Sequence, residues 1–227
     1  MISFGLNPMY GKVADIGTLH VGELNRIEHL RVDGSGKGVN VSLTILSLGG
    51  NNVAAGFMGT GGEGILQRLE ENQVQHNFVP VQSRTRTNLK VLDANGIMTE
   101  LNEPGLIIEK DEWEQLFETL ASYAAPGNVF TLSGSLPRNA SADTYLLLAQ
   151  KLQQKGAAIV LDTDGEPFRL ALKTTPAFIK PNRFELLQYF GVEPDGTLTQ
   201  LRDLCRRLLA QGPKAAVLSM GADGAMY

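Results

Sequence analysis

The sequence predicts an α/β fold in which a mainly parallel β-sheet carries helices on both faces. The second half of the chain alternates short apolar runs with amphipathic stretches, which is the strand–helix order typical of such sheets. One of these runs, 157–161, is apolar at every position, as expected of a strand that is buried on both sides. The length of 227 residues suits one large domain or two small ones and is ample for a sizeable core.

In the first half of the chain we expect two helices with a strand between them. One helix is predicted over 39–48, because its apolar pattern ends at the helix-stopping pair Gly49-Gly50. The strand is predicted over 53–57, and the second helix over 62–72.

The dipeptide Asn95-Gly96 indicates a β-hairpin between 88–92 and 97–101. Both of its residues tolerate the positive φ angles that a two-residue turn between antiparallel strands requires. A hairpin is an addition to a parallel α/β sheet, so we expect it to form a lid over a site.

The second half begins with an amphipathic helix over Lys110–Tyr123, whose apolar residues fall at i, i+3, i+4 and i+7. Two further helices have start and stop signals: Ser141 is predicted to cap one that ends at Gly156, and Thr199 to cap one that ends at Gly212. Three strands, which share a continuous apolar character, are expected at 128–132, 157–161 and 215–218.

The last residues of the chain predict a hairpin that stops in its second strand. An apolar strand over 215–220 is followed by a glycine-bounded turn at 221–224 and by the start of a strand at 225–227. An unfinished hairpin leaves a strand edge exposed. We therefore expect the C-terminal part of the fold to be missing, with one face of the sheet uncovered.

Composition excludes several classes of function. The 20 Lys+Arg and 24 Asp+Glu residues give a net charge of −4, so the basic excess of a nucleic-acid-binding protein is absent. No apolar run approaches the roughly 20 residues that cross a bilayer, and the first residues do not resemble a secretion signal. A single cysteine, Cys205, cannot form an internal disulfide, so a cytoplasmic location is expected. The three histidines lack the spacing of metal ligands.

Glycine is over-represented, at 25 of 227 residues, and one cluster suggests an anion site. Gly34-Ser-Gly-Lys-Gly38 comes directly before the helix predicted over 39–48. Glycine backbone, the free N–H groups of the helix start and the charge of Lys37 could together receive an anion. A flexible turn with a solvated lysine would explain the same residues. A second cluster, at 59–64, is interpreted as a turn and helix cap.

Two other segments suggest phosphate chemistry, and each has a simpler explanation. Arg84 and Arg86 come just before the predicted hairpin, where they could hold a phosphate or form a solvated basic turn. Asn182 and Glu185 follow the apolar run 177–179, at the sheet edge where α/β folds bind ligands. They could organise a hydrated Mg²⁺ or cap a helix.

Seven segments that run from one end of the chain to the other carry a family resemblance. They are Leu6-Asn7-Pro8, Gly22-Glu-Leu-Asn25, Gly36-Lys-Gly-Val-Asn40, Arg84-Thr-Arg-Thr-Asn88, Leu132-Ser-Gly-Ser-Leu-Pro137, Lys180-Pro-Asn-Arg-Phe-Glu185 and Ser219-Met-Gly-Ala-Asp-Gly224. In this order they resemble the PfkB (ribokinase-like) carbohydrate kinases, most closely the branch of the bacterial 1-phosphofructokinases and tagatose-6-phosphate kinases. The resemblance implies a single, incomplete ribokinase-like domain over 1–227, with lid strands within 10–35 and 86–103.

The resemblance also implies an activity, ligands and site residues. The activity is ATP-dependent phosphorylation of a phosphorylated hexose, above all fructose 1-phosphate to fructose 1,6-bisphosphate. The alternatives are a tagatose-6-phosphate kinase and a short homologue that binds sugar phosphate without catalysis. Partners are these small molecules and a second copy through the lid, with no nucleic acid and no membrane. The residues carried over are Gly36, Lys37, Asn40 and Arg86 for the sugar phosphate, Lys180, Asn182, Ser219, Gly221 and Gly224 for the nucleotide, and Asn182 with Glu185 for Mg²⁺ held through water.

Two departures from the family pattern bear on activity. Gly11 stands where the family has an aspartate that binds sugar hydroxyls, and Asp15 is out of register with that position. The family's Gly-Ala-Gly-Asp motif, which supplies an anion hole and the catalytic aspartate, does not occur within 1–227. The resemblance implies that this aspartate lies beyond Tyr227, the last residue of the sequence. No residue is therefore assigned as catalytic, and we expect negligible kinase activity from the 227-residue chain.

Overall fold

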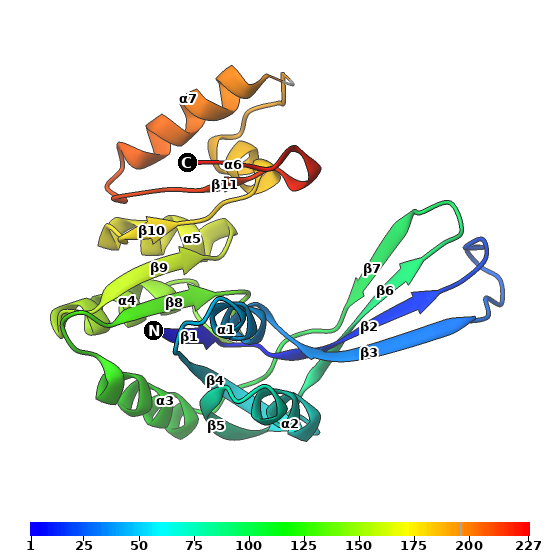
Figure 1. Ribbon diagram of the computed structural model, residues 1–227, viewed down its shortest axis with the longest axis horizontal. Coiled ribbons are helices and arrows are strands. Elements are labelled where there is room, and N and C mark those ends of the chain that lie inside the picture. The colour runs from blue at the N-terminus through cyan, green and yellow to red at the C-terminus, as the bar shows by residue number, and fades with distance from the viewer. Residues whose placement is uncertain (196) are drawn as a thin grey trace.

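Six strands form the central sheet of the molecule, and every neighbouring pair in it is parallel. The computed structural model describes residues 1–195 and 197–227. In spatial order the strands are β10 (Phe178–Ile179), β9 (Ala158–Asp162), β8 (Val129–Ser133), β1 (Ile2–Gly5), β4 (Val53–Thr60) and β5 (Gln75–Arg84). The predicted parallel α/β sheet is confirmed, and Figure 1 shows it crossing the body of the molecule.

Helices cover both faces of this sheet, as the alternating side chains of β4 show. Ala54 packs with Ile65 and Leu69 in a smaller core, whereas Ala55 packs with Leu116 in the larger core on the opposite face. The helices are α1 (Lys37–Ser47) and α2 (Glu63–Glu71) on the first face, and α3 (Lys110–Tyr123), α4 (Thr144–Gln154) and α5 (Gly165–Ala171) on the second, with α6 (Arg183–Phe190) and α7 (Leu198–Leu209) packed together beyond β10.

A second sheet of four strands projects from the body, and we call it the lid (Figure 1). Its strands, in spatial order, are β3 (His29–Ser35), β2 (Met9–Asp15), β6 (Arg86–Leu92) and β7 (Met98–Asn102). The outer pairs are antiparallel, and the central pair β2–β6 is parallel. The hairpin predicted around Asn95-Gly96 is confirmed as β6–β7.

The connection from body to lid between β5 and β6 is a single residue long. β5 ends at Arg84 and β6 begins at Arg86, so Thr85 alone makes the crossing. Thr85 is buried, and its hydroxyl donates a hydrogen bond of 2.9 Å to the carbonyl oxygen of Gly59. This junction is therefore anchored to the end of β4.

Two helix starts differ from the sequence prediction. α4 begins at Thr144 after Asp143 as N-cap, because a turn in which Thr144 N–H bonds the Ser141 carbonyl precedes it. α7 begins at Leu198, since the Thr197 hydroxyl accepts the N–H of Gln200 at 3.1 Å and so takes the capping role expected of Thr199. The predicted helix ends hold, with both helices stopping two or three residues before Gly156 and Gly212.

The two ends of the chain also differ from the prediction. β1 was not predicted at all, although it is a central strand of the sheet. The strand expected over 215–220 is reduced to β11 (Leu218–Ser219), which pairs antiparallel with β12 (Ala225–Met226) outside the six-stranded sheet. The predicted terminal hairpin is thus confirmed, but its second strand ends at Met226, and Tyr227, expected within that strand, lies outside it and is fully exposed. Two isolated parallel bridges link the first strand of the hairpin to the β10 region.

Burial differs between the faces of the outer strands. Ile159 and Leu161 of β9 are fully buried toward α4 and α5, whereas Val160 and Phe178, on the other face, are only half-buried.

In the described part of the chain, no helix is both long and apolar enough to cross a membrane.

Candidate active site

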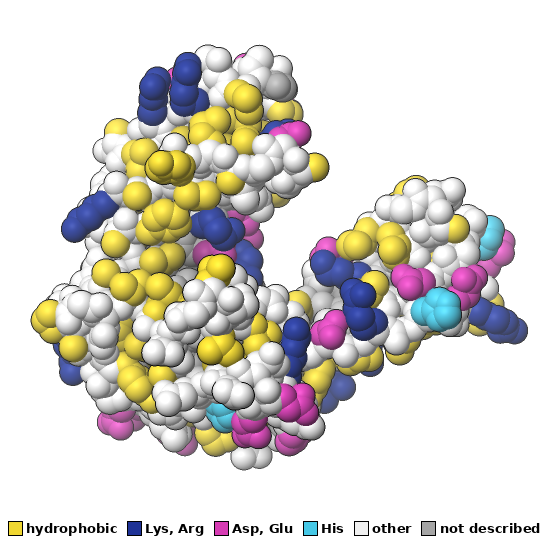
Figure 2. Space-filling view, viewed as in Figure 1, with side chains coloured by type: hydrophobic (Ala, Val, Ile, Leu, Met, Phe, Trp, Pro, Cys, Tyr) yellow, Lys and Arg dark blue, Asp and Glu magenta, His cyan; other side chains and the backbone are white. Residues whose placement is uncertain are grey.

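A cavity of about 220 Å³ lies where the lid meets the body. Its polar lining comes from the β1–β2 connection with Asn7, the start of α1 with Lys37, the first lid residue Arg86, the loop after β8 with Ser135, and Asp164 before α5. Figure 2 shows the open hollow between body and lid. The cavity thus joins segments that are far apart in the sequence.

The glycines at the start of α1 allow the helix to approach the end of β1. A Cβ atom on Gly38 would lie 2.7 Å from the amide nitrogen of Gly5, a distance that no side chain tolerates. Gly36, the N-cap, has φ 129°, and no side chain caps the helix. The free N–H groups and the positive end of the α1 dipole therefore lie at the cavity wall, as an anion site requires.

Asn40 is the one predicted sugar-site residue outside the cavity lining. Its side-chain amide donates to the hydroxyl of Ser35 at 3.3 Å, one turn along α1 on an exposed surface. The structure therefore brings Gly36, Lys37 and Arg86 together, with Asn40 beside them.

Arg84 and Arg86, which sequence analysis left undistinguished, have different surroundings. Arg84 pairs with both carboxylate oxygens of Glu103, at 3.0 and 3.1 Å. The guanidinium of Arg86 reaches the Ser135 hydroxyl at 3.2 Å and the carbonyl oxygens of Asn7 and Glu103 at 3.5 Å. Among the described residues no carboxylate pairs with Arg86, and its buried Nε has no hydrogen-bond partner.

Burial lowers the pKa of Arg86, because partial removal from water disfavours the charged guanidinium. A cation that is partly desolvated and lacks a carboxylate partner favours binding of an anion. Arg86 is thus the residue of the cavity best suited to a phosphate.

Asn7 and Ser135 complete this corner of the cavity, and sequence analysis gave neither a role in the site. The Asn7 side chain donates to the Ser135 hydroxyl at 3.2 Å and accepts the N–H of Leu106 at 3.2 Å. The signal that could have found Ser135 is its place directly after an apolar strand, at the ligand-binding edge of the sheet.

Asp162 is a third residue to which sequence analysis gave no role in the site. It is the last residue of β9, and its side chain is only 9% exposed. Its Oδ1 lies 3.2 Å from Nζ of Lys37 and 3.3 Å from Nζ of Lys180. A lysine assigned to the sugar phosphate and a lysine assigned to the nucleotide therefore meet on one oxygen atom.

Asn182 and Glu185 form a capping box at the start of α6. Asn182 Oδ1 accepts the N–H of Glu185, and Glu185 Oε2 accepts the N–H of Asn182, both at 2.8 Å. The structure therefore contains the helix cap that was the simpler explanation of Asn182 and Glu185. Within the described residues, Glu185 Oε1 accepts no hydrogen bond, so one carboxylate oxygen stays available.

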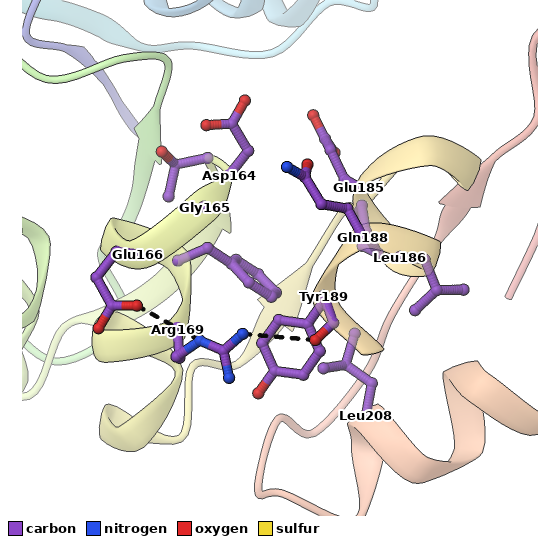
Figure 3. A pocket seen from close by; sticks show the side chains of 12 residues that line it. Asp164, Gly165, Glu166, Arg169, Glu185, Leu186, Gln188, Tyr189 and Leu208 are labelled. Carbon is purple, nitrogen blue, oxygen red and sulfur yellow. Dashed lines mark hydrogen bonds and ion pairs between the residues drawn. The ribbon is translucent and has the colours of Figure 1, made fainter. Parts of the chain in front are cut away.

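Glu185 borders a second cavity, of about 250 Å³, between α5 and α6. Figure 3 shows Asp164 at the start of α5 and Glu185 with Gln188 on α6, on opposite walls at one end of this cavity. The other end holds the rings of Phe168 and Tyr189, edge to face at 5.6 Å, together with the ion pair of Glu166 and Arg169. The described residues contain no group of three or more acidic, histidine or cysteine side chains that could hold a metal ion.

The remaining predicted nucleotide residues lie in the β11–β12 turn, next to Asn182. Ser219 N–H bonds the carbonyl oxygen of Pro181 at 3.0 Å, and Arg183 pairs with Asp223 at 2.7 Å. Gly221 and Gly224 bound this turn. The predicted nucleotide residues are therefore neighbours, although none of them, Lys180 and Asn182 included, lines either cavity described above.

Tyr227, which follows β12, also lines neither cavity. Its side chain is fully exposed. The placement of a catalytic aspartate beyond Tyr227 stays a prediction from the family resemblance.

Comparison with known proteins gives matches along the whole chain. A model described as pfkB family carbohydrate kinase matches residues 5–227. The 1-phosphofructokinase of Xanthomonas campestris pv. campestris is 32% identical over 232 residues, which cover 100% of this chain and 73% of that protein. The 1-phosphofructokinase of Haemophilus influenzae is 28% identical over 228 residues, covering 100% of this chain and 72% of that protein.

Solved structures show the same fold. Phosphofructokinase-2 from Escherichia coli in complex with fructose-6-phosphate has a TM-score of 0.89 at 26% identity, over 99% of this chain and 75% of that chain. The tetrameric inhibited form of the same enzyme has a TM-score of 0.87 at 27% identity, over 99% and 74%. The predicted ribokinase-like fold is confirmed, in a chain that spans about three quarters of these relatives.

Proposed function

The chain belongs to the PfkB family of carbohydrate kinases, and from that premise we propose that it binds ATP and a phosphorylated hexose, with fructose 1-phosphate as the phosphoryl acceptor. The names of its relatives support this sugar phosphate over others. The proposal includes a cytoplasmic location, which the single cysteine favours.

The observation that carries the proposal is the environment of Arg86. Its guanidinium is partly desolvated, contacts Ser135 and two carbonyl oxygens, and has no carboxylate partner within residues 1–195 and 197–227. A phosphate already on the sugar would supply the missing negative charge and accept bonds from the guanidinium and from Ser135. An unphosphorylated sugar offers no such charge.

The remaining cations support a second phosphate-bearing ligand. The ammonium groups of Lys37 and Lys180 both contact the carboxylate of Asp162, between the sugar cavity and the α6 loop. Phosphoryl transfer depends mainly on alignment of the reactants and neutralisation of charge, which such cations supply.

Magnesium fits the acidic end of the second cavity. Asp164 and Glu185 lie on opposite walls at one end of it, and Glu185 keeps one oxygen atom outside its capping box. Carboxylate oxygens are ligands that Mg²⁺ accepts while it retains several waters. Glu185 would hold the ion of a nucleotide–Mg²⁺ complex through water, and Mg²⁺ would neutralise phosphate charge there.

For residues 1–227 alone, the proposal is ligand binding with negligible turnover. No Gly-Ala-Gly-Asp sequence occurs in them, and Gly11 cannot accept a bond from a sugar hydroxyl through a side chain. Fructose-1-phosphate-dependent ADP release well above background would contradict this part of the proposal.

A second copy of the chain is proposed to dock on the apolar face of the lid. Val32, Leu89 and Leu101 occupy one cross-strand row of this face, in which Lys12 of β2 stands between Val32 and Leu89. Val32 and Leu101 are 48% and 57% exposed. Exposed apolar side chains in a row across a sheet are a feature of association surfaces.

Titration calorimetry of the 227-residue chain tests the proposed ligands. Fructose 1-phosphate, fructose 6-phosphate, tagatose 6-phosphate and unphosphorylated fructose are each titrated with and without a non-hydrolysable ATP analogue and Mg²⁺. Fructose 1-phosphate is expected to bind at least about tenfold more tightly than fructose, since one charge-assisted contact contributes ~1.5–3 kcal/mol. Equal binding of fructose and its phosphates would overturn the proposal.

A further inference from the structure

Asp162 contacts two lysines that belong to different predicted ligand sites, Lys37 to the sugar-phosphate site and Lys180 to the nucleotide site. The same atom, Oδ1, lies 3.2 Å from Lys37 Nζ at the start of α1 and 3.3 Å from Lys180 Nζ after β10. Lys37 lines the sugar cavity, whereas Lys180 precedes the α6 loop. One carboxylate oxygen therefore contacts a lysine predicted for the sugar phosphate and a lysine predicted for the nucleotide.

The carboxylate is held more firmly than the lysines that contact it. The Asp162 side chain is 9% exposed, against 42% for Lys37 and 43% for Lys180. The backbone of Asp162 is fixed as well, because its carbonyl oxygen accepts the N–H of Gly134 at 3.0 Å. The lysine side chains are long and flexible, so they can turn toward an incoming anion while Asp162 stays in place.

Sharing one oxygen makes the two lysines dependent on each other. A carboxylate that faces two ammonium groups holds each of them less tightly than it would hold one alone, because the two like charges repel. When one lysine turns away, the other becomes the sole partner of a nearly buried carboxylate. It is then harder for a ligand to draw that lysine away.

We infer that Asp162 is a positioning residue that couples the sugar-phosphate site to the nucleotide site through Lys37 and Lys180. The inference rests on the proposed function for the identity of the two ligands, whereas the ion-pair bridge itself stands on the geometry of the chain. It gives Asp162 a role that requires no contact with either ligand.

A double-mutant cycle measures this coupling as a nucleotide affinity. Lys37→Met is made in the wild type and in Asp162→Asn, which removes the charge but keeps the size of the side chain. With Asp162 present, Lys37→Met is expected to weaken a non-hydrolysable ATP–Mg²⁺ analogue about fivefold, because Asp162 then holds Lys180 alone. In the Asp162→Asn background the same change should alter affinity less than about twofold.

The ratio of the two effects decides the question. The ratio compares the loss of nucleotide affinity that Lys37→Met causes in the wild type with the loss it causes in Asp162→Asn. Removal of a positive charge near the nucleotide acts in both backgrounds, so it cancels in this ratio. A ratio near one overturns the inference. Lys214→Met, which changes an exposed lysine in the segment before β11, serves as the matched charge control and should leave the affinity unchanged.

A ligand-free measurement separates this inference from the proposed function. In the chain with ¹³C-labelled lysine, Lys37→Met should shift the Cε–Hε NMR signal of Lys180, while Lys214→Met should not. If no nucleotide binds but this shift is seen, the proposed function fails and the bridge stands. If the Lys180 signal does not respond, the bridge is refuted even where nucleotide binds. This arm needs no Asp162 variant, so it decides the matter if Asp162→Asn does not fold.

Discussion

Arg86 donates a hydrogen bond of 3.2 Å to the hydroxyl of Ser135, 49 positions further along the chain. The bond joins the first residue of a lid strand to the loop after β8 in the body. A phosphate at this corner would therefore contact both parts of the molecule.

The first prediction is that Arg86, and not Arg84, binds the phosphate of the sugar. Arg86→Ala is expected to weaken fructose 1-phosphate at least about tenfold, because a charge-assisted contact contributes ~1.5–3 kcal/mol. Nucleotide affinity should change less than about twofold. Calorimetric titration of each ligand measures both effects. Arg84→Ala is the matched control, since Arg84 already pairs with Glu103. Equal losses for both ligands in Arg86→Ala would show that this arginine is misassigned.

The second prediction concerns the contact between α1 and β1. Gly38→Ala places a Cβ atom 2.7 Å from the Gly5 nitrogen, so the helix start must shift. Overpacking of this kind is expected to lower the free energy of unfolding by about 1–3 kcal/mol, measured by urea denaturation. Gly17→Ala is the control, because the nearest atom to its Cβ is a side-chain oxygen of Glu28 at 3.7 Å. A Gly38→Ala chain as stable as Gly17→Ala would contradict the close approach.

The third prediction concerns Tyr145, whose hydroxyl donates to the carbonyl oxygens of Ser133 and Gly134 at 2.9 and 3.1 Å. Tyr145→Phe should cost about 1 kcal/mol at pH 7, because both carbonyls lose a donor. Complete burial raises the pKa of Tyr145, with the negative charges of Asp162 and Asp164 adding to the effect.

The raised pKa gives this stability a pH dependence. The unfolded chain ionises Tyr145 near pH 10, while the folded chain keeps the proton. The stabilisation is therefore complete below about pH 10 and decreases above it. Urea unfolding of the wild type and Tyr145→Phe at pH 8 and pH 10.5 tests this. The wild-type advantage should be smaller at the higher pH, and an advantage that grows there would refute the assignment.

The fourth prediction concerns association through the lid. Leu101→Glu puts a charge in the exposed apolar row with Val32, so the proposed dimer should dissociate to monomer. Light scattering after size-exclusion chromatography measures the mass. Asn102→Glu adds the same charge on the opposite face of β7 and should leave the dimer intact. A wild-type chain that is monomeric at the highest soluble concentration would rule out this surface.

Local patterns predicted most of the elements. The α3 boundaries follow from its apolar spacing, and the β6–β7 hairpin follows from Asn95-Gly96, because both depend on neighbours in the sequence. β1 has only four residues, too few for a periodic pattern, although it pairs with both β4 and β8.

The contacts of the candidate site depend on distant parts of the chain, so the sequence could not predict them. Lys37, Asp162 and Lys180 meet because α1 packs beside β8 while β9 and β10 are neighbours. No local rule indicates that Arg84 belongs to the body sheet and Arg86 to the lid. The resemblance selected the segments, while the tertiary structure decided which side chains within them face a cavity.

The crossing at Thr85 makes the lid sensitive to a residue that lines neither ligand cavity. Its hydroxyl hydrogen bond to Gly59 anchors the β5 side of the junction, and Arg86 follows directly. Loss of the Thr85 hydroxyl would remove this side-chain anchor one residue before the guanidinium that contacts Ser135. Substrate preference in this chain could therefore change in evolution through the joint between two sheets, with every ligand-contacting residue unaltered.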